Sequence, residues 1–316
     1  FARIYQSMDL LPHHNCRVTG NLNANHGPGP EQWVLLNLWF QEHLAGREQN
    51  IPKTPPSTFK IKNGRAHFSV IPSSLDRLVE TEIYYSYDPN CVTRFWKRAS
   101  ATKKGDTWKA NFKVQSKLPL YVFALCRFKL AEEAVLERGN TTMTFTLNSQ
   151  LHSHIPGDID LSAIAKLSKS GLLDNFSRGI GNWSSRDQSS IKTYKFQDPE
   201  LDTSSGNKLV LHFNLKKDQA LLLGLSAESK FLGNGRDLGS FHYGRRIAGD
   251  GSKSIVLTTG DFKSNDSKAL EWSKISTFSI SLTDQKTKRK IKLTDLEALK
   301  VLERIELVSE GKKIER

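Results

Sequence analysis

Short strand-like segments separated by turn residues fill most of this 316-residue sequence. The clearest example lies at residues 59–62 and 66–70, where two segments flank the dipeptide Asn63-Gly64. An Asn-Gly pair between two such segments is the strongest short-range signal for a β-hairpin, because both residues tolerate positive φ angles. Similar segments follow along the chain at intervals of about 8–12 residues, a spacing typical of β-sandwiches. We therefore expect a mainly β protein.

The strand-like segments form two groups, which predict two domains. Residues 57–149 are expected to form an immunoglobulin-like β-sandwich, with Trp96 and Trp108 filling its interior. Residues 171–316, with about eight strands, are expected to form a jelly-roll β-sandwich of the galactose-binding-like kind. Residues 150–170 connect the two domains.

Residues 1–46 have a different pattern, in which a turn is followed by a helix. The turn contains His26 among glycine, proline and asparagine residues, and apolar residues at helical spacing predict a helix at residues 33–45. Residues 47–56, which hold three prolines, are expected to be a linker. A histidine on such a turn is typical of the last strand, loop and helix of an α/β-hydrolase domain, where it acts as the general base.

If residues 1–46 are the tail of a catalytic domain, most of that domain would precede Phe1. The apolar side of the predicted helix would then lack a sheet to pack on within this chain. We therefore expect Trp33, Leu36 and Phe40 to be exposed. Asp9 is a conceivable acid partner for the catalytic histidine, although it does not lie at a recognisable strand end.

The net charge of +13 and the isoelectric point of about 9.6 indicate an anionic partner. The lysines and arginines are spread along the strand-like segments, and the densest run, residues 286–290, is expected to be a hairpin turn. Nucleic acid is not expected as a partner, because the sequence has no aromatic-basic RNA-binding segment and no helix-turn-helix pattern. No apolar run reaches about 18 residues, so no membrane span is expected either.

The cysteine spacing does not predict a zinc site. Cys16, Cys91 and Cys126 contain no C-x-x-C pair. Cys91 and Cys126 could form a disulfide if their strands are neighbours, and the odd number leaves at least one cysteine free.

Histidines and aspartates give equally weak signals for a metal. The pairs His13-His14 and His152-x-His154 each lack a third ligand. Asp174 and Asp261 leave open a structural calcium ion, but they lie far apart in the sequence. No metal or cofactor is therefore expected.

Aromatic and cationic residues in the second predicted domain are candidates for glycan binding. Trp183, Phe241 and Tyr243 could stack on the apolar face of a sugar ring. Arg245 and Arg246 could bind uronate or sulfate groups through bidentate hydrogen bonds. The alternative is that the aromatic residues, Trp183 above all, pack in the core of the domain.

Several motifs together resemble a family of bacterial α/β-hydrolases. Residues 21–27, Asn-Leu-Asn-Ala-Asn-His-Gly, are similar to the family's catalytic-histidine loop. Other motifs are similar to its appended sandwich and to the opening of its jelly roll, at residues 83–87, 93–98, 105–110, 173–176 and 181–183. The family is related to the PhoPQ-activated pathogenicity-related proteins and to acetylxylan-esterase-like enzymes, and it carries immunoglobulin-like and carbohydrate-binding-type jelly-roll domains.

The resemblance implies that the chain is the C-terminal part of a secreted or periplasmic serine hydrolase that cleaves ester or peptide bonds. His26 would be its catalytic base. The sequence contains no G-x-S-x-G motif, so the nucleophile would lie upstream of Phe1 and the chain alone would be inactive. The alternative is a non-catalytic binding protein for acidic glycans, acting through residues 171–316.

Overall fold

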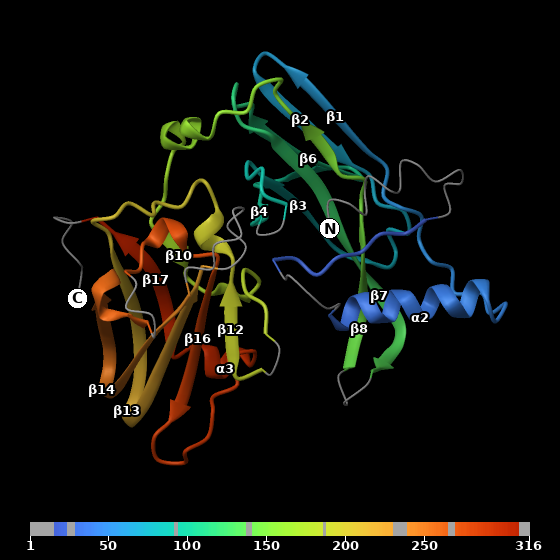
Figure 1. Ribbon diagram of the computed structural model, residues 1–316. Coiled ribbons are helices and arrows are strands. Elements are labelled where there is room, and N and C mark those ends of the chain that lie inside the picture. Colours follow the sequence, from blue (N-terminus) through green and yellow to red (C-terminus); the bar gives the residue numbers. More distant parts are fainter. Residues whose placement is uncertain are drawn as a thin grey trace. The chain divides into compact units, whose positions relative to one another are not determined.

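The computed structural model describes residues 16–23, 29–91, 94–136, 141–185, 188–229, 239–264 and 269–309. The protein is mainly β, with several antiparallel sheets and few helices, as the sequence predicts (Figure 1). The chain divides into two compact units. Unit 1 is formed mainly by residues up to Ala163, and unit 2 mainly by residues from Ile164 onward. No helix in the described ranges is long and apolar enough to span a membrane.

The first sheet of unit 1 has four strands in the order β1-β2-β6-β5. The predicted hairpin is confirmed: β1 pairs with β2, and Asn63 and Gly64 form the turn with φ angles of 50° and 69°. The strands are β1 Ser57–Lys62, β2 Arg65–Val70, β5 Thr102–Lys104 and β6 Thr107–Lys113.

The second sheet of unit 1 has the order β4-β3-β7-β8, and β9 also pairs with β7. Its strands are β3 Leu78–Ser86, β4 Lys97–Arg98, β7 Leu120–Val135, β8 Thr141–Asn148 and β9 His152–His154. The two sheets share a buried apolar cluster to which Phe68, Ile83, Phe112 and Val122 contribute. Unit 1 is therefore a β-sandwich.

The predicted helix is present as α2, Pro30–His43, and Pro30 stands at the first helical turn, where proline is favoured. Contrary to expectation, α2 packs on a sheet that belongs to this chain. Val34 and Leu35 are buried in a cluster with Phe128 of β7 and Phe145 of β8. The sequence did not indicate this contact, because the helix carries apolar residues on more than one side.

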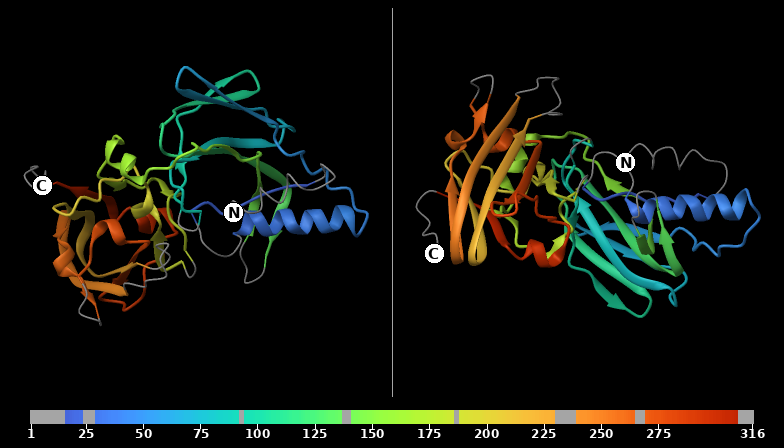
Figure 2. Two further views of the ribbon diagram at one scale, coloured as in Figure 1. Left: turned by 45° about the horizontal axis from the view of Figure 1, so that its top comes forward. Right: turned by 90° about the horizontal axis from the view of Figure 1, so that it is seen from below.

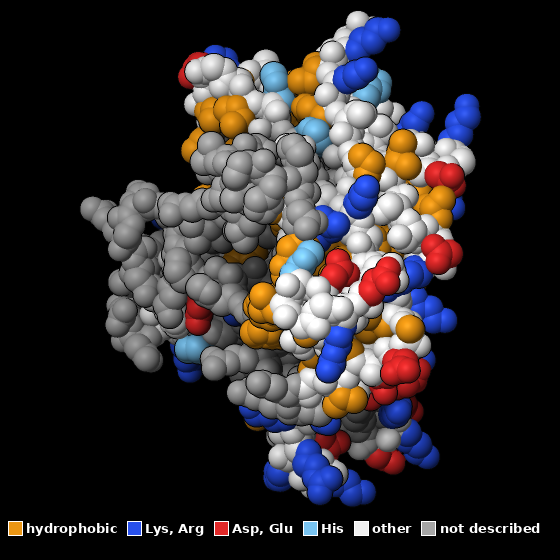
Figure 3. Space-filling model, turned by 90° about the vertical axis from the view of Figure 1, so that its right-hand side faces the viewer, with side chains coloured by type: hydrophobic (Ala, Val, Ile, Leu, Met, Phe, Trp, Pro, Cys, Tyr) orange, Lys and Arg blue, Asp and Glu red, His pale blue; other side chains and the backbone are white. Residues whose placement is uncertain are grey.

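A second apolar stripe of α2 remains exposed, as expected for Trp33, Leu36 and Phe40, which are 47%, 39% and 48% exposed. Leu44, just after the helix, extends the stripe. Figure 3 looks at the right-hand side of Figure 1, where α2 lies, and shows hydrophobic side chains at several places on that surface. One side of α2 thus packs on the sheet of unit 1, and the other side is about half exposed.

Unit 2 has a main sheet in the order β10-β17-β13-β14-β15, with β16 on β13 and β12 on β16. The two long strands, β13 and β14, run side by side in Figures 1 and 2. The strands of unit 2 are β10 Leu172–Asp174, β11 Ser177–Ile180, β12 Ser190–Thr193, β13 Lys208–Glu228, β14 Ser240–Leu257, β15 Lys263–Ser264, β16 Thr277–Asp284 and β17 Leu302–Val308.

An irregularity divides the β13–β14 hairpin into two parts. Leu215 pairs with Gly251 and Gln219 with Gly249, so three residues of β13 stand opposite one residue of β14. Gly249 and Gly251 adopt φ angles of 143° and 72°, which favour glycine. Before this point β13 pairs with β17, and after it with β16. One buried apolar cluster nevertheless includes residues from both parts.

The basic run at residues 286–290 is a hairpin turn, as predicted. The backbone N–H of Asp284 donates to the carbonyl of Arg289 at 2.9 Å, and that of Ile291 donates to the carbonyl of Leu282 at 2.8 Å. Thr283 and Lys290 stand opposite each other in an antiparallel bridge.

Candidate functional site

The candidate site is the surface of the β12-β16-β13-β14-β15 part of unit 2 that faces away from the core. Leu223, Leu225 and Ala227 of β13 are buried in the core cluster. Because side chains alternate along a strand, Gly224 and Ser226 lie on the opposite face. Residues directly opposite in an antiparallel pair share a face, so the register identifies their neighbours.

Three rows of side chains cross this face. The first row is Lys192, Ser279, Ser226, His242 and Lys263, one from each of five strands. Strands are about 4.8 Å apart, so the row is roughly 19 Å long. It begins and ends with a lysine and is otherwise formed by two serines and a histidine.

The middle row contains only glycine and serine: Ser190, Ser281, Gly224 and Gly244. A Cβ atom at Gly224 would lie 2.7 Å from Ser281 Oγ, so glycine allows β16 to approach closely there. A Cβ atom at Gly244 would have no neighbour nearer than 3.8 Å, and Gly244 is exposed. The side chains of the middle row therefore project little from the sheet.

The third row is basic again at both ends: Lys290, Thr283, Leu222 and Arg246. Successive rows are two residues apart along each strand, or roughly 7 Å. The two basic rows are therefore roughly 14 Å apart, with the glycine and serine row between them. We call this three-row surface the basic trough.

The cations of the basic trough have no carboxylate partner among the described residues. In the part of the chain that the structure describes, Lys192, Lys263, Arg246 and Lys290 form no salt bridge. The three rows contain no acidic residue, and Glu228 follows in the next row, opposite Ser240. The basic trough is thus a positively charged surface with small side chains along its middle row and serine hydroxyls along it.

The structure separates the residues that the sequence had grouped. Arg246 lies in the basic trough, but Tyr243 and Arg245 lie on the opposite face, because they pair with the buried residues Leu225 and Leu223. Tyr243 is half-buried against the core, with its ring centroid 5.9 Å from that of Phe262. Tyr243, Arg245 and Arg246 therefore cannot act together on one ligand surface.

Trp183 and Phe241 are in the core of unit 2. Trp183 is 5% exposed, stacks on Phe176, and donates its indole N–H to Asp174 Oδ2 at 2.8 Å. Phe241 is also buried. Neither side chain presents the open aromatic face that sugar stacking requires.

The carboxylates considered for calcium have other partners. Asp174 also accepts hydrogen bonds from the backbone of Phe176 and from the Asn182 amide, while Asp261 accepts from the backbone and hydroxyl of Thr258. Among the described residues, no group of three or more histidine, cysteine, aspartate or glutamate side chains is placed to hold a metal ion.

Other candidates fall in unit 1 or outside the described residues. His26, Asp9 and His13-His14 lie outside them. His152 hydrogen-bonds to Ser57 Oγ at 2.9 Å and packs near aromatic rings. Cys91 and Cys126 are both free thiols, and Cys126 is completely buried.

Sequence reasoning missed Lys192, His242, Lys263 and Lys290 as members of the site. They come from segments that are far apart in the chain and are aligned only by strand pairing. The alternation around Gly224 and Gly244 is visible in the sequence, but the register that joins them is not.

Comparisons with known proteins give weak similarities. No protein-family description and no curated protein matches the chain. Among solved structures, one described as a carbohydrate-binding module of the β-sandwich superfamily has 9% identity and a TM-score of 0.20, covering 84% of this chain and 95% of its own. The tandem CBM22-1–CBM22-2 domain of Paenibacillus barcinonensis Xyn10C has 11% identity and a TM-score of 0.24, covering 81% and 82%.

Both solved structures are carbohydrate-binding modules, but such low TM-scores do not show a shared fold or a shared function. The resemblance to α/β-hydrolases finds no support in the comparisons. A functional assignment of the candidate site therefore depends on the chemistry of its own residues.

Proposed function

We propose that the protein binds acidic polysaccharide in the basic trough of unit 2. The observation that carries the proposal is the pair of rows ending in Lys192, Lys263, Lys290 and Arg246, without carboxylate partners in the described chain, on either side of a row of glycine and serine. A flat surface of this kind accommodates an extended polymer, and the cations attract its carboxylate or sulfate groups. A serine hydroxyl can both donate and accept a hydrogen bond, so Ser226 and Ser279 of the first row suit the hydroxyls of a sugar.

An acidic polysaccharide fits the basic trough better than single-stranded nucleic acid. Sequence-tolerant binding of single strands relies on aromatic side chains on which the bases stack. The three rows of the basic trough contain no aromatic residue other than the His242 imidazole. Binding there depends on charge and hydrogen bonds, which a uronate polymer supplies. A secreted or periplasmic location, as expected from the sequence, would bring the protein into contact with such polymers.

The adjacent arginines provide a matched test. In affinity electrophoresis we expect the full chain to be retarded by polygalacturonate and not by neutral hydroxyethylcellulose. Arg246→Ala should weaken the retardation about fivefold to tenfold, since a charge-assisted hydrogen bond is worth roughly 1.5–3 kcal/mol and part of it is regained by neighbours. Arg245→Ala removes the same charge from the opposite face and should have little effect.

Two results would contradict the proposal. Equal losses in Arg245→Ala and Arg246→Ala would mean that net charge alone, and not the trough, holds the polymer. The second result is competition between soluble ligands. If single-stranded oligodeoxythymidine releases the protein from immobilised polygalacturonate at lower concentrations than soluble polygalacturonate does, the surface binds nucleic acid.

We also infer the fold types of the two units. The orders β1-β2-β6-β5 and β4-β3-β7-β8 correspond to the A-B-E-D and C′-C-F-G sheets of immunoglobulin-type sandwiches, which supports an immunoglobulin-like assignment of residues 57–149. The antiparallel strands around one core support a jelly-roll assignment of residues 171–316.

The second candidate function is that the chain belongs to a serine hydrolase in which residues 1–46 complete a catalytic domain. The exposed stripe of Trp33, Leu36 and Phe40 supports it, because such stripes usually meet another apolar surface. In a protein that contains the catalytic domain, His26→Ala should lower ester hydrolysis by about a thousandfold or more. Normal turnover of this variant would remove His26 from the catalytic residues.

A further inference from the structure

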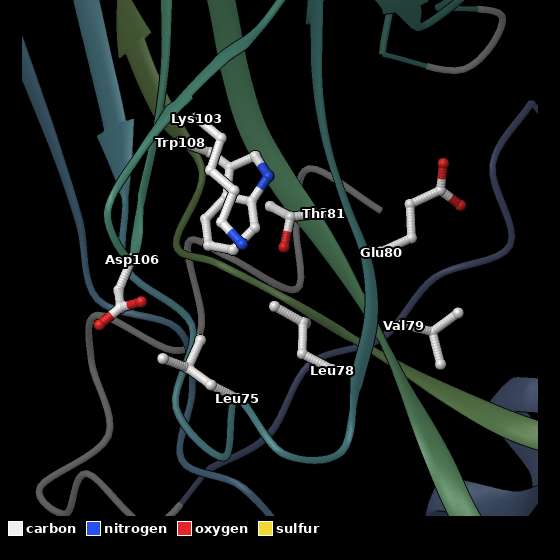
Figure 4. Close-up of a pocket in the computed structure, with 8 residues that line it drawn as sticks. All are labelled: Leu75, Leu78, Val79, Glu80, Thr81, Lys103, Asp106 and Trp108. Atoms are coloured by element: carbon white, nitrogen blue, oxygen red, sulfur yellow. The ribbon is translucent and has the colours of Figure 1, made fainter.

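Unit 1 contains a cleft beside Trp108 that the proposed function does not use. It has a volume of about 300 Å³, and Figure 4 shows its lining residues. These residues come from β3, from the segment before β3, and from the β5–β6 hairpin. A second hollow of about 530 Å³ shares Thr81, Lys103 and Trp108 with it.

Trp108 forms the aromatic wall of this Trp108 cleft. The residue is half-buried on β6, where it pairs with Val70 on one side and Lys103 on the other. The Lys103 ammonium lies 4.6 Å from the centroid of the indole ring. Figure 4 shows Leu75 and Leu78 across the cleft from the indole, so the cleft has apolar surfaces on two sides.

Two charged groups at the Trp108 cleft have no ion-pair partner among the described residues, although the Lys103 ammonium already lies over the indole ring. Within the described residues, the Asp106 carboxylate forms no hydrogen bond or ion pair, and the Lys103 ammonium has no carboxylate partner. Lysine only donates hydrogen bonds and an ionised carboxylate only accepts them. A ligand that satisfies both needs groups that donate and accept, which hydroxyls do.

We propose that the Trp108 cleft binds a neutral sugar ring. One face of such a ring carries C–H groups that stack on an indole, and its rim carries hydroxyls for Lys103 and Asp106. A volume of about 300 Å³ is at the lower end of the range for small-ligand pockets. A ligand with a single net charge is attracted by one of these two groups and repelled by the other, whereas the hydroxyls of a neutral ring hydrogen-bond to both.

This site is independent of the basic trough, since its lining residues all belong to unit 1. The test is saturation-transfer NMR on the full chain with an equimolar mixture of cellohexaose, xylohexaose and mannohexaose. We expect transfer to ring protons of at least one oligosaccharide. Arg246→Ala, which alters the basic trough, should leave this signal unchanged, so that failure of one proposal does not decide the other.

Matched variants identify the cleft. Trp108→Ala should abolish the transfer, while Trp33→Ala, which removes an exposed tryptophan of α2, should retain it. Because Trp108 packs against the core of unit 1, Asp106→Asn serves as a variant that leaves packing intact. It should weaken binding about threefold to tenfold with an unchanged melting temperature.

Three results would overturn the proposal. These are no transfer to any of the three oligosaccharides in the unmodified protein, full transfer in Trp108→Ala, and undiminished binding in Asp106→Asn. The last result would mean that the cleft takes an apolar group, such as a peptide side chain, for which the carboxylate is irrelevant.

Discussion

The Trp108 cleft of unit 1 and the basic trough of unit 2 are both formed on antiparallel β-sheets, but they present opposite chemistry. The cleft is hollow, has an aromatic wall, and carries Lys103 and Asp106, which have opposite charges, near its rim. The trough is nearly flat, contains no large aromatic ring, and has a cation at each end of its two outer rows. The difference lies in side-chain size: bulky residues beside a gap between elements make a hollow, and glycine and serine between lysines make a flat charged surface.

The comparison also separates two kinds of driving force. Stacking and desolvation in a cleft depend weakly on ionic strength, whereas attraction between exposed charges is screened within about 10 Å at 0.1 M salt. The two units should therefore respond differently to pH, salt and surface substitutions.

The largest expected difference concerns alkaline pH. Burial raises the pKa of the Cys126 thiol to about 12, against an ordinary value of 9.0, although a weak hydrogen bond from Thr81 of the cleft opposes the shift. Below pH 9 the thiol is neutral in both the folded and unfolded states. Above it, the unfolded chain loses the proton and the folded chain keeps it, so unit 1 loses stability until pH reaches about 12.

At pH 11 this loss should be roughly 3 kcal/mol, or about a hundredfold in the unfolding equilibrium. Urea unfolding between pH 8 and pH 11 measures it, with Cys126→Ala as the control that should lack this component of the pH dependence. Unit 2 contains no cysteine, so trough binding should not depend on this thiol. Identical pH dependence in the wild type and Cys126→Ala would contradict the buried-thiol explanation.

The next largest difference concerns salt. Raising NaCl from 50 to 500 mM should weaken polygalacturonate binding by the basic trough about tenfold or more, because the four cations act through screened Coulomb attraction. Oligosaccharide binding by the Trp108 cleft should change by less than about twofold, since stacking does not depend on long-range charge. Isothermal titration at both salt concentrations measures the two effects. A salt-independent trough would remove charge as its basis.

The smallest expected effect concerns the floor of the basic trough. Gly244→Val places a branched side chain on the exposed middle row, where an added Cβ has no close neighbour. Valine is favoured in strands over glycine, so the melting temperature should stay equal or rise slightly. Polygalacturonate binding should fall about threefold, because the side chain separates the polymer from the serines. Unchanged binding in this variant would show that only the lysines and Arg246 matter.

The local features of the fold were predictable from the sequence. Asn63-Gly64 predicted the first hairpin, and the basic run at residues 286–290 predicted another. The spacing of apolar residues predicted most of α2. Each depends on residues within a few positions of one another, where turn geometry and side-chain periodicity act directly. The burial of Val34 and Leu35 was missed, because it depends on β7 and β8, about a hundred residues away.

The candidate site was only partly predictable. Alternation along a strand already places adjacent arginines on opposite faces, but it does not say which face is buried. That choice follows from the pairing of Arg245 with Leu223 and of Arg246 with Leu222. The contributions of Lys192 and Lys263 depend on β12 and β15, whose order in the sheet no local pattern reveals.

The irregularity between Leu215 and Gln219 fixes this pairing from a distance. Three residues of β13 stand opposite Asp250, and the glycines on either side of Asp250 accommodate the mismatch. Sliding the hairpin by one residue would move this irregularity onto residues that lack positive φ angles, and it would turn every side chain beyond it to the other face. The bulge therefore fixes the register of the hairpin, with Arg246 on the solvent side and Tyr243 on the core side, although neither residue is part of it.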